Sequence, residues 1–195
     1  MNMVVVLLVA ALFSGSAVGA EIEEPSWQLV DKFDSVELRY YEPSIQAKTT
    51  LADSAKTSAG FRRLAGFIFG GNSTSQKIAM TAPVQETLVG DHPIMSFTMP
   101  GQYSFADLPQ PNDPRVALEE APAKTVAVIR FSGWATGAVV SRKTDELLAV
   151  LNERAIDVIG APSLNQYNPP WTLPFLRRNE VMVEIASTKF STATR

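Results

Sequence analysis

Residues 77–84 read KIAMTAPV, and this octet decides the fold that the sequence predicts. Apolar residues at positions 78, 80, 82 and 84 alternate with the residues between them, as in a strand with one buried face. The alternation puts Met80 on the apolar side and Pro83 near the end. The simplest interpretation is a strand that packs into a core. The alternative is one wall of a site for a large apolar ligand.

The segments around the octet predict a strand, a helix and a second strand. VELRYY at 36–41 alternates, with Val36, Leu38 and Tyr40 on one side, and the strand continues through residues 45–51. A helix is predicted over 54–69, where Phe61, Leu64, Ala65 and Ile68 share one face and Gly70-Gly71 end it. A strand follows at 94–100. The proline-rich stretch 101–123 is typical of a long surface connection.

The same order of elements then repeats. A strand is predicted at 125–134, a helix over 141–160 that ends at Gly160, and a last strand at 179–185. The first strands begin near Val36 and Val126, which indicates an internal duplication. The sequence therefore predicts an α+β domain. Two strand–helix–strand–strand units form a distorted antiparallel β-barrel flanked by two helices.

Composition bounds the class of function. The chain has 195 residues, a formal net charge of −3 and no cysteine. That length favours one domain, and the acidic balance argues against a nucleic-acid binder, which needs clustered Lys and Arg. The absence of cysteine excludes disulfides, thiolate nucleophiles and Cys-ligated metals.

The N-terminus predicts export. Residues 1–20 have an apolar run followed by small residues, as in a signal peptide cleaved between Ala20 and Glu21. The mature protein would then be a domain at 21–187 with a flexible tail at 188–195. We expect it to be periplasmic or secreted, with no stable membrane span after cleavage. An uncleaved N-terminal membrane anchor is the alternative.

Catalytic motifs are scarce, whereas binding residues are abundant. The only histidine, His92, lies in the turn-like GDHP, and the sequence has no GxSxG, Walker, HExxH or GxGxxG motif. Flat and flexible apolar side chains suit a ligand pocket. They include ten Phe together with Met80, Met95, Met99, Met182, Trp27, Trp134 and Trp171.

Three segments resemble the SOUL haem-binding family. They are ELRYYEP, KIAMTAPV with the following FTMP, and NPPWTLPFLRRNEV, and the resemblance spans about residues 25–186. It implies a distorted barrel with two helices that binds haem or a related tetrapyrrole without catalysis, as carrier, buffer or sensor. It also implies an apolar groove beside the first helix. Some members carry a histidine where this chain has Tyr40, so binding without a protein axial ligand is implied here.

This hypothesis gives a set of candidate site residues. Three of them, Arg62, Arg63 and Lys77, would meet the propionates of the ligand. The whole candidate set is Tyr40, Phe61, Arg62, Arg63, Leu64, Ile68, Lys77 and Met80. No residue is predicted to ligate the iron, and no protein partner is predicted.

Two other functions stay open at this level, because a fold alone does not choose among them. One is an effector-binding module for other amphipathic small molecules, in which Glu184 would meet a cationic ligand. The other is a small hydrolase of lipophilic substrates that uses Glu and Tyr side chains.

Overall fold

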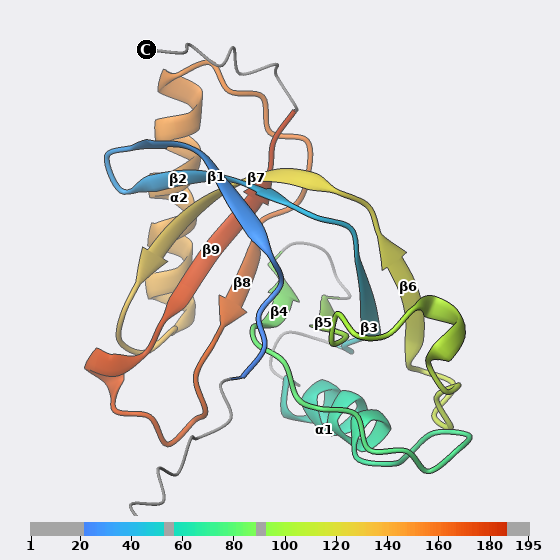
Figure 1. Ribbon diagram of the computed structural model, residues 1–195. Helices are drawn as coiled ribbons and strands as arrows, with labels where there is room; N and C mark the ends of the chain where they lie inside the picture. The colour runs from blue at the N-terminus through green and yellow to red at the C-terminus, as the bar shows by residue number, and fades with distance from the viewer. Residues whose placement is uncertain (1–21, 53–56, 89–92, 187–195) are drawn as a thin grey trace, which may run out of the picture.

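The computed structural model describes residues 22–52, 57–88 and 93–186. These residues form one antiparallel sheet of nine strands that curls into a half-barrel, with two long helices outside it (Figure 1). The predicted α+β fold is confirmed. The predicted signal peptide, the predicted tail and His92 lie outside the described residues. No helix built by the described residues is both long and apolar enough to cross a membrane.

The chain builds its elements in two similar runs after an initial strand. The helices are α1 (Thr57–Ile68) and α2 (Gly137–Glu153), with short 3₁₀ turns at η2 (Phe105–Asp107) and η3 (Pro174–Leu176). The strands are β1 (Trp27–Phe33), β2 (Val36–Tyr41), β3 (Ser44–Thr50), β4 (Val84–Thr87), β5 (Ile94–Thr98), β6 (Ala117–Ala121), β7 (Lys124–Phe131), β8 (Ser163–Gln166) and β9 (Asn179–Glu184).

The duplication is confirmed, and the two repeats exchange a strand. The sheet order is β1-β2-β7-β9-β8-β4-β5-β3-β6. Helix α1 packs on the half of the sheet formed by β4, β5 and β3, and α2 packs on the half formed by β8, β9 and β7. The two halves join where β4 pairs with β8. The strand before each unit pairs with the other unit, β2 with β7 and β6 with β3. The equivalent first strands are thus β3 and β7, so the predicted match of Val36 with Val126 was wrong by one strand.

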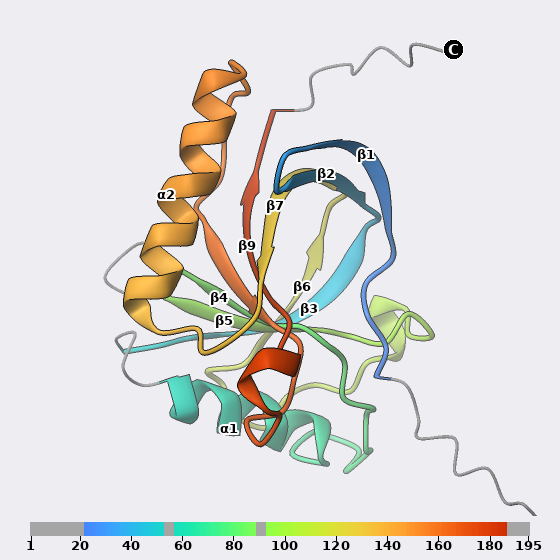
Figure 2. The same cartoon turned by 90° about the vertical axis from the view of Figure 1, so that its left-hand side faces the viewer.

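Each helix covers its own half of the same sheet face (Figure 2). Under α1, Leu64, Phe67 and Ile68 pack with Ala47 and Phe97, and all five are at most 2% exposed. A separate cluster under α2 includes Leu147, Leu151, Ala127 and Val181, each fully buried. The strands under each helix bring apolar residues to it at every second position, as a half-buried sheet requires.

The opening octet is not a strand over most of its length. Lys77 and Thr81 make only single bridges, and regular pairing begins at Val84. The Ile78 amide instead donates to Ile68 O at 2.8 Å, and the Ala82 amide to Glu23 O at 2.9 Å. Proline at position 83 has no amide hydrogen for a ladder. The predicted burial of Ile78 and Ala82 is nevertheless confirmed.

Two other boundaries differ from the prediction. Helix α2 begins at Gly137 because the Thr136 hydroxyl caps it by accepting from the Val139 amide. It ends at Glu153, seven positions before Gly160, and Ala155 adopts a left-handed φ of 52° just beyond the end. The stretch 101–123 is not merely a connection, because it contains β6.

Two glycines of α1 should respond to alanine in opposite directions. A Cβ at Gly60 would lie 2.3 Å from Cδ2 of the buried Leu51, whereas a Cβ at Gly66 would meet nothing within 4 Å. We expect Gly66→Ala to raise the free energy of unfolding by about 0.5–1 kcal/mol, the gain of alanine over glycine in a helix. We expect Gly60→Ala to lower it by about 1–2 kcal/mol, because overpacking outweighs that gain. Urea denaturation of both variants checks the pair, and equal stabilities would contradict the close approach at Gly60.

Candidate functional site

A shallow groove of about 830 Å³ runs beside α1. Helix α1 forms one wall and the loop at residues 112–115 forms the other. The volume lies in the range of small-molecule sites, roughly 300–1,000 Å³. The residues that define its chemistry are Arg62, Arg63, Gly66, Gly71, Asp113 and Arg115.

Three guanidinium groups line this groove, and two of them are held in place. Arg63 Nη1 donates to Thr49 Oγ1 at 2.8 Å and to Thr50 O at 2.9 Å. Arg115 forms a two-pronged ion pair with Asp113, with distances of 2.9 and 2.7 Å. That guanidinium lowers the pKa of Asp113 to about 2, so the carboxylate stays charged at neutral pH. Arg62 is exposed on the same wall.

The floor of the groove is flat where two glycines meet. Gly66 leaves open space above the helix. A Cβ at Gly71 would lie 2.6 Å from Gly66 O, and the Gly71 amide donates to that oxygen at 2.8 Å. A side chain at either position would therefore fill or distort the floor.

The structure separates the predicted site residues into three sets. Arg62 and Arg63 line the groove. Leu64 and Ile68 are at most 1% exposed and fill the core beneath α1, with Met80 packed against that core.

The remaining predicted residues lie elsewhere. Phe61 is 41% exposed, with its ring centroid 5.5 Å from that of Phe97. Lys77 is exposed and follows the helix. Tyr40 lies on β2 and shares the side of that strand with Val36 and Leu38, which pack under α2. Tyr40 is therefore not gathered with the α1 residues.

A second cleft, of about 710 Å³, lies between the segment before β1 and the β2–β3 and β6–β7 turns. Four carboxylates line it, those of Glu23, Glu24, Glu42 and Glu120, among prolines and a floor that includes Met99. All of its lining residues belong to the described part of the chain, and none of them is Lys, Arg or His. We call it the acidic cleft.

A third surface is apolar and exposed, and we call it the aromatic patch. It comprises Trp134, Trp171, Leu173, Phe175 and Leu176, each at least 56% exposed. The Gly133 amide donates to Pro174 O at 2.8 Å, and this bond joins the β7–α2 loop to the β8–β9 loop. The guanidinium carbon of Arg177 lies 3.9 Å from the Trp134 ring centroid. Figures 1 and 2 both place the β8–β9 loop at the same end of the molecule as α1.

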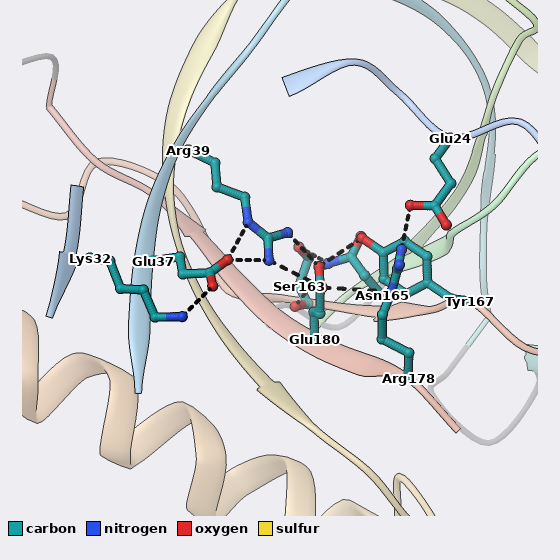
Figure 3. Close-up of polar contacts among 9 residues, drawn as sticks. All are labelled: Glu24, Lys32, Glu37, Arg39, Ser163, Asn165, Tyr167, Arg178 and Glu180. Atoms are coloured by element: carbon teal, nitrogen blue, oxygen red, sulfur yellow. Dashed lines mark hydrogen bonds and ion pairs between the residues drawn. The ribbon is translucent and has the colours of Figure 1, made fainter. Parts of the chain in front are cut away.

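The concave face of the sheet holds a buried network of charges (Figure 3). Arg39 on β2 donates to both Glu180 oxygens on β9, at 2.9 and 3.3 Å, although 141 residues separate them. It also donates to Glu37 at 3.0 and 2.7 Å. Burial alone would lower the pKa of Arg39, but the bonds to Glu180 raise it above its ordinary value.

The network continues from Glu180 to the segment before β1. The Tyr167 hydroxyl donates to Glu180 Oε2 at 2.7 Å, and burial together with the Glu180 charge raises the pKa of that hydroxyl. Arg178 lies 3.7 Å from Glu180 Oε1, stacks 3.3 Å from the Tyr167 ring centroid and pairs with Glu24. The sequence prediction missed this network. The sequence contains one sign of this network, the charged residues at alternate positions in residues 37–39 and 177–180. By itself this pattern indicates only a strand face that points to solvent.

A sequence model of one family, described as SOUL heme-binding protein, matches residues 22–184. The chain is a member of the SOUL family. This SOUL protein is 29% identical to "Heme-binding protein 2" of Mus musculus over 201 aligned residues. The alignment covers 87% of this chain and 95% of the mouse protein. This SOUL protein is 28% identical over 151 residues to the Homo sapiens protein of that name, with coverages of 70% and 73%.

The fold of this SOUL protein also occurs at much lower sequence identity. The C-terminal domain of EcmrR superposes with a TM-score of 0.62 at 9% identity, over 83% of this chain and 99% of that domain. At this identity the likeness concerns the fold alone. Within the ranges that the structure describes, His, Asp and Glu side chains form no group of three that could hold a metal ion.

Glu180 should be the most sensitive residue of the concave network in this SOUL protein. It is 1% exposed, so Glu180→Gln leaves the buried Arg39 without its main counter-charge. We expect a loss of about 3–5 kcal/mol in the free energy of unfolding, the usual cost of breaking a buried ion pair. The control Glu37→Gln should lose about 1 kcal/mol or less, because the Glu37 side chain is 25% exposed. Guanidinium denaturation measures both, and equal losses would contradict the buried pair.

Proposed function

We propose that this SOUL protein binds haem or a related tetrapyrrole in the groove beside α1, non-covalently and without catalysis, as a carrier, buffer or sensor. The observation that carries the proposal is the pairing of a flat floor at Gly66 and Gly71 with a rim of guanidiniums at Arg62, Arg63 and Arg115. A tetrapyrrole supplies a planar apolar face and carboxylate side chains. Family membership supports the same ligand class.

The energetics of such a complex are moderate. Covering apolar surface contributes about 25 cal/mol per Å², and this gain is limited here because the groove is shallow and lined mainly by glycine, charged and amide residues. Association entropy offsets part of this gain. Charge-assisted bonds from Arg62, Arg63 and Arg115 to the propionates add specificity, since guanidinium and carboxylate groups match geometrically. This balance fits a reversible complex, as carriage or buffering requires.

Electrostatics favour this groove over the acidic cleft. The two ionised propionates of a tetrapyrrole are negatively charged, and Glu23, Glu42 and Glu120 would repel them. The α1 groove presents three guanidiniums against the single carboxylate of Asp113, which Arg115 already pairs.

Two further features belong to the same proposal. We infer that none of the predicted site residues ligates the iron, because Tyr40 lies on the side of β2 that packs under α2. We therefore also infer that a metal-free porphyrin binds in the same groove. We further propose that the protein is exported, because residues 1–20 have the pattern of a signal peptide.

Filling the groove should abolish binding. Gly66→Leu adds a side chain over the flat floor, and leucine is a better helix former than glycine, so the fold is retained. We expect the Kd for hemin to rise at least about tenfold. Titration of the variant with hemin, measured by the Soret band, gives this Kd. Gly137→Leu in α2 is the matched control, because that glycine also has open space around it and lies outside the groove. Equal hemin affinities of the two variants would contradict the assignment of the haem site to this groove.

The guanidinium rim should contribute a salt-dependent part of the affinity. We expect the double variant Arg62→Ala/Arg63→Ala to bind hemin roughly tenfold more weakly at low ionic strength, with a smaller difference at high salt. Arg142→Ala, an exposed arginine on α2, should change nothing. An unchanged Kd in the double variant would contradict the rim. Loss of binding in Trp171→Ala alone would instead place the ligand on the aromatic patch.

A further inference from the structure

A separate cavity lies on the concave face of the sheet, opposite the face that carries the two helices. Its volume is about 210 Å³, and it is bounded by β3, β4, β5, β7, β8 and β9. A smaller cavity of about 40 Å³ adjoins it and shares Gln46, Lys124 and Met182. The proposed haem groove shares no residue with either cavity. The concave cavity is therefore a distinct place in the molecule.

Lys124 faces this cavity without a direct partner. It is the first residue of β7 and points to the same side as Val126 and Val128, which lie on the concave face. Its side chain makes no hydrogen bond or ion pair with any residue of the described ranges. Burial lowers the pKa of Lys124, Glu184 raises it and Lys48 lowers it further.

Glu184 brings the opposite charge to the same cavity. It pairs in register with Val126, so it lies diagonally across from Lys124 on the neighbouring strand. The two side chains form no ion pair within 4 Å. Gly160 fixes this end of β9, because its amide donates to Glu184 O at 3.3 Å and a Cβ there would lie 2.8 Å from Glu184 Cβ.

The walls of the cavity are polar and built by hydrogen bonds. Gln85 Nε2 donates to Ser163 Oγ at 3.0 Å, and Ser96 Oγ donates to Gln85 Oε1 at 3.4 Å. Gln46 is 8% exposed, lines both cavities, and its amide group has no hydrogen-bond partner among the described residues. The Gln46 amide atoms keep contact with solvent in the cavity, so they are available to form hydrogen bonds with a ligand there.

The charges around the cavity balance. Lys48 also lines it, but Glu119 neutralises Lys48 at 2.8 Å. Lys124 and Glu184 remain, one of each sign, and neither has a direct partner within residues 22–52, 57–88 and 93–186. A simple anion would be repelled by Glu184 and a simple cation by Lys124, whereas a molecule with both charges satisfies both.

We propose that this cavity binds a small amino acid, with the carboxylate on Lys124 and Gln46 and the ammonium group on Glu184. The volume corresponds to about seven water molecules at roughly 30 Å³ each, which matches a solute of the size of alanine or valine. Met182 and Val126 supply an apolar wall for a short aliphatic side chain.

Calorimetric titration of the full protein with three matched compounds tests the ligand class. L-Valine carries both charges, 3-methylbutanoate lacks the ammonium group, and isobutylamine lacks the carboxylate. We expect saturable binding of L-valine, and binding at least about tenfold weaker for the other two. No saturation by L-valine up to about 10 mM would overturn the proposal, since that range covers weak millimolar sites. Equal binding of 3-methylbutanoate or of isobutylamine would also overturn it.

Two variants test the residues. We expect Lys124→Met and Glu184→Gln each to weaken L-valine binding at least about tenfold and to leave hemin binding unchanged. The controls Lys143→Met and Glu153→Gln make the same chemical changes on α2 and should bind L-valine normally. Circular dichroism and thermal midpoints establish that all four variants fold. Unchanged L-valine affinity in either cavity variant would overturn the assignment.

Discussion

Both helices cover the same face of the curled sheet, so side chains of the sheet itself must close the concave face. On the covered face, apolar residues from alternate strand positions pack beneath α1 and α2 in two separate cores. No helix of the described residues packs on the concave face, and the sheet buries charged groups there beside a small apolar cluster of Val126, Val128 and Met182. Arg39 and Glu180 are buried there to 4% and 1% exposure. Burying such charges is costly unless they are paired and hydrogen-bonded. Arg39 and Tyr167 donate hydrogen bonds to Glu180 and meet that requirement, and the Arg178 guanidinium adds a positive charge 3.7 Å from Glu180 Oε1.

The surfaces that could bind ligands differ in charge, and this difference sorts their ligands. The groove beside α1 is rich in guanidiniums, and the acidic cleft has four carboxylates. The concave cavity is lined by Lys124 and Glu184, which have opposite charges, and by Lys48, which Glu119 pairs. These environments coexist in a chain with a net charge of only −3. Local charge thus decides more than net charge does. The charge of the first surface complements anionic ligands, and that of the second does not.

Much of the fold could be predicted from the sequence, because it depends on local periodicity. On the predicted apolar face of α1, Leu64, Ala65 and Ile68 are buried as their spacing predicts, whereas Phe61 is 41% exposed. Gly70 and Gly71 follow the end of the helix, as predicted. The octet 77–84 shows the limit. Its alternation correctly predicted that Ile78 and Ala82 are buried, but Thr81 and Pro83 are buried as well, whereas Met80 and Val84 are only partly buried. The backbone explains the difference, since Ile78 bonds to the end of α1 rather than to a strand.

The candidate sites were less predictable, because they depend on contacts between distant segments. Arg62 and Arg63 could be placed on a groove from their position on α1. Arg115, on the opposite wall, could not, since its stretch gave only a loop pattern. The polar sides of β2 and β9 indicated solvent exposure, and only the register of the whole sheet brings Arg39 to Glu180. The register of the whole sheet also brings Lys124 and Glu184 to the same cavity, so the sequence alone could not predict it.

The exchange of β2 and β6 between the repeats has a consequence for how the chain holds together. Neither repeat has a complete set of sheet partners, since β2 pairs with β7 and β6 with β3. The protein is therefore equivalent to a strand-swapped dimer whose two subunits are joined covalently by residues 99–116. Joining them replaces a concentration-dependent association by a fixed effective concentration. Assembly of the half-barrel is thereby independent of dilution.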